Sequence, residues 1–197
     1  MQVLGVDPHK GSHTAAAVAP DGTVLGRTRV VSLAGGSQRR HHHWGTVNKP
    51  DQGDTITVQF SQRMAVATLC NTWSGNSTDQ SISTNSVVTV NLVNSGAADS
   101  LTVTTTAAAC GGAPKFGTFA LGANYVTANR TCSGAGAAAS TVSWTASTST
   151  LTIKLGTCSA SLAVATSTIT YTPNAAAQNS TGTAVTGTAS SANAAHF

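Results

Sequence analysis

Short runs in which apolar and polar residues alternate dominate the chain from residue 53 onward. These runs are DTITVQF (54–60), SVVTVNLV (86–93), DSLTVTTT (99–106), STVSW (140–144), STLTIKLG (149–156) and TSTITYTP (166–173). A period of two indicates a strand with one face in the core, and no long helical period occurs. Glycine, asparagine and serine fill the gaps between the runs. The pattern predicts a mainly β domain built as two packed antiparallel sheets.

The first 32 residues carry a different pattern. VLGVD is a short apolar run, and HTAAAVAPDGTVLG reads as two strands joined by a turn at Pro20-Asp21-Gly22, with RTRVVS as a third strand. The stretch LAGGSQRRHHHWG has no periodicity. We therefore expect an N-terminal hairpin fragment at 1–32, a junction at 33–45 and the β domain at 46–197. A last strand is expected around AVTGTA (184–189), followed by a frayed tail.

Composition narrows the class of protein. The chain has 197 residues, of which 40% are hydrophobic, so it can bury a core. Only 8% are charged, all six acidic residues are aspartates, and threonine, serine, alanine and glycine are abundant. This composition is typical of β-rich extracellular modules. The net charge of +4 is spread thinly beyond residue 45 and forms no basic stripe, which does not favour DNA as a partner.

The stretch GVDPHKGSHTAAAVAPDGTVLGRTRV (5–30) resembles the start of the RuvC-like domain of DEDD insertion-sequence transposases related to the Piv invertase. The resemblance covers about the first 44 residues. It implies that Asp7 corresponds to the first carboxylate of a metal site for DNA cleavage, which the family completes with a glutamate and two further aspartates.

One aspartate cannot assemble a two-metal site, and the chain contains no glutamate. The contexts of Asp51, Asp54, Asp79 and Asp99 indicate turns and strand starts. We therefore expect a truncated RuvC-like fragment in which Asp7 is a remnant, with no catalytic residues, metal or cofactor. The alternatives are an active DEDD transposase, or a fusion relic with no function.

The β portion has its own resemblance. GDTITVQFSQRM, LCNTWSG, SVVTVNL, DSLTVT, FGTFALGANYV, STVSWTASTSTLTIKLG and ITYTPNAA resemble, in their order, bacterial immunoglobulin-like modules of secreted and cell-surface proteins. The resemblance implies an immunoglobulin-like antiparallel β-sandwich that acts as a spacer or adhesion module. It leaves the ligand or surface partner unidentified.

The four cysteines all lie in the β portion, where an even number suggests two disulfides. Of the three connectivities we favour Cys70 with Cys110 and Cys132 with Cys158; buried free thiols are the alternative. A zinc site is not expected, because there is no CxxC pair and no histidine nearby in the sequence.

Two features of the sequence point to different cellular compartments. MQVLGVDPHK lacks the basic and apolar regions of an export signal, and no transmembrane segment is expected, although the β portion is of an extracellular type. Localisation therefore stays open.

Several other side chains have two interpretations. His41, His42 and His43 bind metal adventitiously or are solvated, and His9 and His13 are expected to be exposed. Trp73 and Trp144 are carbohydrate platforms or, as we favour, buried beside disulfides. Asn76, Asn129 and Asn179 each begin an N-x-S/T sequon.

Overall fold

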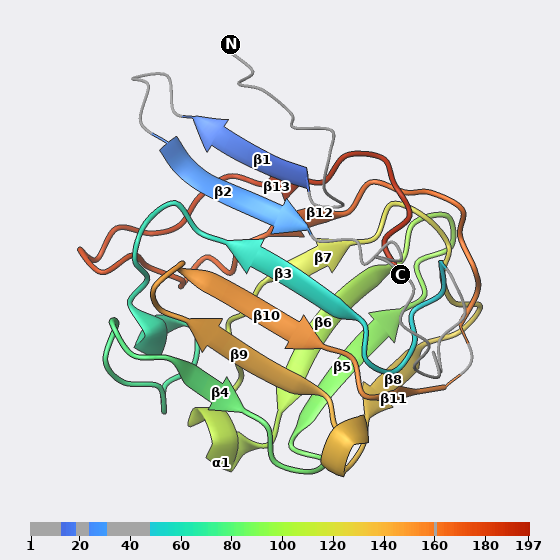
Figure 1. Ribbon diagram of the computed structural model, residues 1–197, viewed down its shortest axis with the longest axis horizontal. Helices are drawn as coiled ribbons and strands as arrows, with labels where there is room; N and C mark the ends of the chain where they lie inside the picture. The colour runs from blue at the N-terminus through green and yellow to red at the C-terminus, as the bar shows by residue number, and fades with distance from the viewer. Residues whose placement is uncertain (1–12, 19–23, 31–47, 160) are drawn as a thin grey trace, which may run out of the picture.

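The computed structural model describes residues 13–18, 24–30, 48–159 and 161–197, which are mainly β (Figure 1). Their strands form a two-stranded, a four-stranded and a seven-stranded sheet, and all the strand pairs are antiparallel. Helical structure in these residues is limited to α1 (Ala107–Cys110) and to 3-10 turns at Val66–Thr68 and Gly136–Ala138. The prediction of a mainly β chain with two large antiparallel sheets is confirmed.

The four-stranded sheet draws its strands from distant parts of the sequence. Its order is β3 (Thr55–Gln59), β10 (Thr150–Lys154), β9 (Thr141–Thr145) and β4 (Gln80–Ile82). Ile56, Ile153 and Val142 are register partners across its first three strands, and all three are buried. Because successive residues point to opposite faces, the threonines between them lie on the other face. The alternation at 54–60, 140–144 and 149–156 thus marks strands with one buried face.

The seven-stranded sheet combines two long central strands with short flanking ones. Its order is β11 (Thr157–Cys158), β8 (Arg130–Ser133), β5 (Val88–Val93), β6 (Ser100–Thr105), β7 (Thr118–Ala120), β12 (Thr170–Thr172) and β13 (Ala189–Ser190). Valine and leucine at alternate positions of β5 and β6 are buried, as the sequence pattern predicts.

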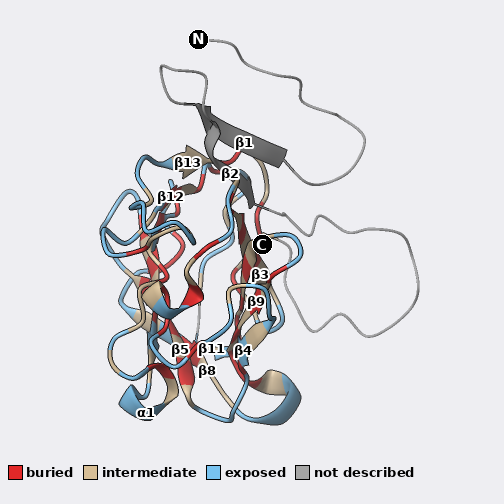
Figure 2. Cartoon of the chain, turned by 90° about the vertical axis from the view of Figure 1, so that its left-hand side faces the viewer, coloured by how far each residue is buried: buried red, intermediate tan, exposed pale blue. Residues whose placement is uncertain are grey.

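The two larger sheets face each other as layers, with the core between them (Figure 2). Phe60, which directly follows β3, contacts Trp144 of its own sheet and Tyr171 of the facing sheet, so one aromatic contact crosses this space. The ring of Phe60 lies 5.9 Å from that of Trp144 on β9 and 6.2 Å from that of Tyr171 on β12. Gly117 lies against Tyr171 with φ at 82°, and a Cβ there would overlap the Tyr171 ring. The arrangement is therefore that of a β-sandwich.

The N-terminal strands β1 (His13–Val18) and β2 (Val24–Val30) form the two-stranded sheet. They form a hairpin, as predicted, but RTRV belongs to the same strand as VLG rather than to a third one. β2 lies alongside β3, although no strand ladder joins the two within the described residues (Figure 1). The turn at Pro20-Asp21-Gly22 and the run VLGVD lie outside those residues.

The C-terminal tail differs from the prediction in two ways. The expected strand at 184–189 is replaced by the shorter β13 at Ala189–Ser190, because Gly187 has φ at 83° and interrupts the extended run. The tail also does not fray. Phe197 is buried edge-on against Tyr125, with the ring centroids 5.2 Å apart, and its carbonyl accepts a hydrogen bond from the backbone N–H of Asn48. The apolar burial of the last residue anchors the chain end.

Candidate functional site

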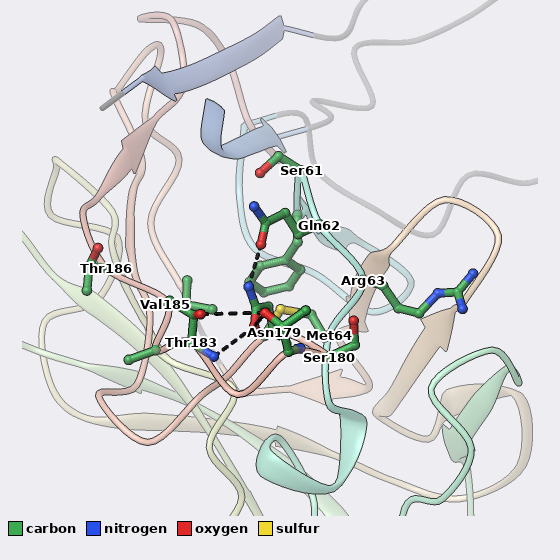
Figure 3. Close-up of a pocket in the computed structure, with 12 residues that line it drawn as sticks. Ser61, Gln62, Arg63, Met64, Asn179, Ser180, Thr183, Val185 and Thr186 are labelled. Atoms are coloured by element: carbon green, nitrogen blue, oxygen red, sulfur yellow. Dashed lines mark hydrogen bonds between the residues drawn. The ribbon is translucent and has the colours of Figure 1, made fainter. Parts of the chain in front are cut away.

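A groove of about 540 Å³ opens at one end of the sandwich, where the chain leaves β3 (Figure 3). Two segments that are far apart in the sequence line it. The lining residues are Phe60, Ser61, Gln62, Arg63, Met64, Asn179, Ser180, Thr181, Thr183, Ala184, Val185 and Thr186. Its volume is in the range typical of small-molecule sites.

Backbone hydrogen bonds hold the two lining segments side by side. Met64 and Asn179 form an isolated antiparallel bridge. The N–H of Ser180 donates to the carbonyl of Arg63 at 2.8 Å, and the N–H of Ala65 donates to the carbonyl of Gln178 at 3.0 Å. The groove is thus fixed by the fold itself.

Asn179 organises the turn that forms one wall. Its Oδ1 accepts hydrogen bonds from the N–H and hydroxyl of Thr181, at 3.1 and 2.8 Å, and from the N–H of Thr183 at 2.8 Å. Its Nδ2 donates to Oε1 of Gln62 across the two segments. Gly182 closes the turn with φ at 84°. The side chain that begins the third sequon therefore serves the fold through both its oxygen and its nitrogen.

The lining combines an apolar floor with neutral polar walls. Phe60 and Met64 are buried and Val185 is half-buried, while most of the hydroxyl- and amide-bearing residues are exposed. Arg63 is the only charged residue among the described residues of the lining, and its guanidinium donates to the hydroxyl of Ser77 at 3.0 Å, away from the groove in Figure 3. This chemistry suits binding of an uncharged polar molecule and supplies no acid, base or nucleophile pair.

The aspartates that the structure describes do not converge on one point with other possible metal ligands. Asp7 lies outside the described residues, as do His9, His41, His42 and His43, and of His13 only the backbone is described. Asp54 immediately precedes β3, and Asp79 immediately precedes β4 in the same sheet. Asp99 immediately precedes β6 in the seven-stranded sheet, so all three stand at strand starts, as their sequence contexts predict. In the part of the chain that the structure describes, no three His, Cys, Asp or Glu side chains are placed to hold one metal ion.

Asp99 is fully buried and satisfies backbone donors. Its Oδ2 accepts hydrogen bonds from the N–H groups of Tyr125 and Val126, both at 2.7 Å, and its Oδ1 accepts one from the N–H of Ser95 at 3.0 Å. Sequence analysis assigned Asp99 only to a strand start. Its role in closing the 121–126 loop onto β6 requires the tertiary structure.

All four cysteines are paired as the sequence analysis favours. Cys70 bonds Cys110 with their Cα atoms 4.9 Å apart, and Cys132 bonds Cys158 with their Cα atoms 4.1 Å apart. The first bond joins the β3–β4 connection to α1, which follows β6, so it cross-links the two large sheets. The second links register partners of β8 and β11 at the edge of one sheet.

One serine–histidine contact was missed by sequence analysis. The Oγ of Ser191 lies 3.1 Å from Nε2 of His196, and both residues are buried. The same Nε2 lies 2.8 Å from the carbonyl oxygen of Ser167, so it must carry the proton that this bond requires. The Ser191 hydroxyl already donates to the carbonyl of Ala192 and accepts from the N–H of Ile169. The pair therefore anchors the tail and is not arranged as a nucleophile and base.

Both tryptophans considered as sugar platforms are buried. Trp73 packs on Phe116 with ring centroids 5.4 Å apart, and its backbone N–H donates to the carbonyl of Cys70. Trp144 lies in the core against Phe60. The expected burial is confirmed for both, and the stacking-platform interpretation is wrong; the expected position beside a disulfide is seen for Trp73 next to Cys70.

No described helix has the length and apolar character needed to cross a membrane. Comparisons of the chain with protein-family models, with curated proteins and with solved structures found no match. Both family resemblances therefore stay predictions.

Proposed function

We propose that this chain is a non-catalytic β-sandwich module of the secreted or cell-surface type, immunoglobulin-like in its β portion and preceded by an inactive transposase remnant. The observation that carries the proposal is the pair of disulfides, which uses every cysteine of the chain. Structural disulfides form and persist in oxidising compartments. A cross-link between the two sheets suits a module that must hold its shape outside the cell.

The buried acidic and imidazole groups support the same proposal. Asp99 accepts hydrogen bonds from three backbone N–H groups, and Nε2 of His196 bonds the carbonyl of Ser167. Neither group faces the groove, whose walls carry hydroxyls and amides. Of the two roles of such modules, adhesion is favoured over a plain spacer because a spacer has no need of a preformed groove.

The test is to produce the full chain with and without export to an oxidising compartment. We expect exported protein to contain two disulfides by alkylation and mass mapping, and to unfold at a higher temperature than cytoplasmic, reduced protein. A matched variant with Cys70 and Cys110 both changed to alanine should lose the difference in part. Folded protein with four free thiols and an unchanged melting temperature would contradict the proposal.

A second experiment separates this proposal from the transposase alternative. Purified protein with Mg²⁺ or Mn²⁺ is expected not to cleave or join DNA, and Asp7→Ala should leave stability nearly unchanged. A two-metal mechanism requires several converging carboxylates, and four of the six aspartates lie in the β portion. Metal-dependent cleavage that Asp7→Ala abolishes would overturn the non-catalytic proposal.

A further inference from the structure

The groove retains hydrogen-bonding groups that the fold does not use. The Gln62 amide accepts from Asn179 through its oxygen, while its Nε2 points away from Asn179 in Figure 3 and makes no hydrogen bond to another described residue. The hydroxyls of Ser180 and Thr186 likewise have no partner there. These three side chains are exposed and border one hollow. They offer two hydroxyls and one NH₂ group to a ligand.

The charge of the described lining does not favour a charged ligand. Among the described residues that line the groove, Arg63 is the one charged side chain and is turned toward Ser77, and none is acidic. A carboxylate, phosphate or ammonium group entering the groove would lose hydration without gaining an opposite charge. The ligand class that remains is uncharged and polar.

The apolar floor completes the chemical match. Half-buried Val185 and exposed Ala184 present carbon surface in the groove, while Phe60 and Met64, at 7% and 1% exposure, add little to it. A neutral sugar ring has the same division, since its C–H groups form apolar patches and its hydroxyls lie at the rim. The wall is held rigid by the hydrogen bonds of the Asn179 side chain, so little ordering is needed when a ligand binds.

We infer that the groove between 60–64 and 179–186 binds an uncharged glycan chain. This inference rests on the proposed function as an adhesion-type module and specifies its ligand class. With few neutral hydrogen bonds and a small floor, a Kd on the order of 1 mM is expected for a short oligosaccharide.

The test is a titration of the full, oxidised, ¹⁵N-labelled chain with cellotriose, maltotriose and triacetylchitotriose, each to about 20 mM, well above that Kd. Shifts in amide resonances should be confined to 60–64 and 179–186. Trigalacturonic acid is the charged control, and a neutral Ser-Gly peptide is the control for a protein ligand. Both are expected to give smaller shifts than at least one neutral trisaccharide.

Two variants locate the site. Thr186→Val removes one wall hydroxyl at nearly constant shape and should weaken binding by about 3- to 10-fold, the effect of one neutral hydrogen bond. Thr152→Val, in β10 and outside the groove, should leave Kd unchanged within about twofold. Equal weakening by both variants would place the site elsewhere.

Three outcomes overturn the inference. These are the absence of groove shifts with every neutral trisaccharide, larger shifts with the acidic sugar, and larger shifts with the peptide, which would indicate a protein ligand. If in any of these cases the spectrum is that of a folded protein and both disulfides are intact, the glycan inference fails but the proposed function stands. Free thiols in the folded chain would instead remove the proposed function on which it rests.

Discussion

Asp99 carries the one fully buried carboxylate among the described residues, and three backbone N–H groups depend on it. Asp99→Asn keeps the shape but turns an NH₂ group toward donors that need an acceptor. We expect a loss of about 2–4 kcal/mol in the free energy of unfolding, measured by urea denaturation.

The matched control is Asp79→Asn, because Asp79 is exposed and accepts a single bond, from the N–H of Ala146. Its expected loss is at most about 1 kcal/mol. If both variants lost a similar amount of unfolding free energy, the hydrogen bonds of Asp99 would not specifically stabilise the 121–126 loop.

The two tyrosines of the chain predict its behaviour at alkaline pH. Burial raises the pKa of Tyr171 above its ordinary value, and burial raises the pKa of Tyr125 against the opposing effect of its hydrogen bond to Ser167. The unfolded chain ionises each phenol near pH 10, whereas the folded chain keeps it neutral to higher pH. Stability is therefore fully present below about pH 10 and is lost as pH rises through and above that value.

Tyr171→Phe tests this directly, because the Tyr171 hydroxyl is buried without a hydrogen-bond partner. At neutral pH the variant should be as stable as the parent or up to about 1 kcal/mol more stable. At about pH 11 its advantage should grow by about 1.4 kcal/mol, as urea denaturation at both pH values would measure. A loss above about 1 kcal/mol at neutral pH would reveal a partner for the hydroxyl.

At the scale of single residues, the sequence predicted roles better than partners. The strand-start positions of Asp54 and Asp79 follow from local turn chemistry, which acts over a few neighbouring residues. The bonds of Asp99 to the loop at 121–126 and of Asn179 to Gln62 join residues distant in the sequence. No local pattern encodes such pairs.

At the scale of elements, strand length decided what could be predicted. β3, β5, β6, β9 and β10 have five or six residues, enough for the alternation to show. β4, β7, β8 and β11 have two to four residues, too few to establish a period, and they were not assigned as strands. β12 has only three residues but was predicted, because the alternation at 166–173 extends beyond the strand itself. The tail was expected to fray because it is rich in small residues, but Phe197 supplies an apolar anchor at its very end.

The N-terminal hairpin is expected to contribute little to the stability of the sandwich. A two-stranded sheet is marginal by itself, and no ladder joins β2 to β3 within the described residues. Deleting residues 1–45 should lower Tm by less than about 4 °C, corresponding to about 1 kcal/mol for a domain of this size. Scanning calorimetry of the two proteins measures the change. A drop of more than about 10 °C would show that the hairpin belongs to the core.

At the scale of the whole molecule, the sequence predicted the framework but not the groove. Composition and alternation indicate a sandwich, and the even cysteine count indicates cross-links, because both depend on general properties of the chain. The groove depends on the meeting of 60–64 with 179–186, which flank different strands of the sandwich. Since neither segment carries a recognisable motif, their juxtaposition could be found only in three dimensions.

The two disulfides should differ in how readily they are reduced. Cys70 and Cys110 are both fully buried, whereas Cys158 is half-buried in a two-residue strand at the sheet edge. Thiol–disulfide exchange requires access to a sulfur atom, so a reductant should open Cys132–Cys158 first. Alkylation after increasing times in dithiothreitol, followed by peptide mapping, gives the order of reduction.

Their contributions to stability should nevertheless be similar. The sequence separations of 40 and 26 residues predict losses of about 4 kcal/mol for removing Cys70–Cys110 and about 3.5 kcal/mol for removing Cys132–Cys158, from the entropy of the unfolded chain. Paired cysteine-to-alanine variants, compared by urea denaturation, measure each loss. Because the first bond joins the two sheets and the second lies within one, simultaneous removal should cost at least the sum, about 7.5 kcal/mol, which is half or more of the roughly 5–15 kcal/mol typical of a domain. A doubly substituted chain that unfolds like the parent would show that the sandwich holds without its cross-links, and extracellular ancestry would then rest on the strand pattern alone.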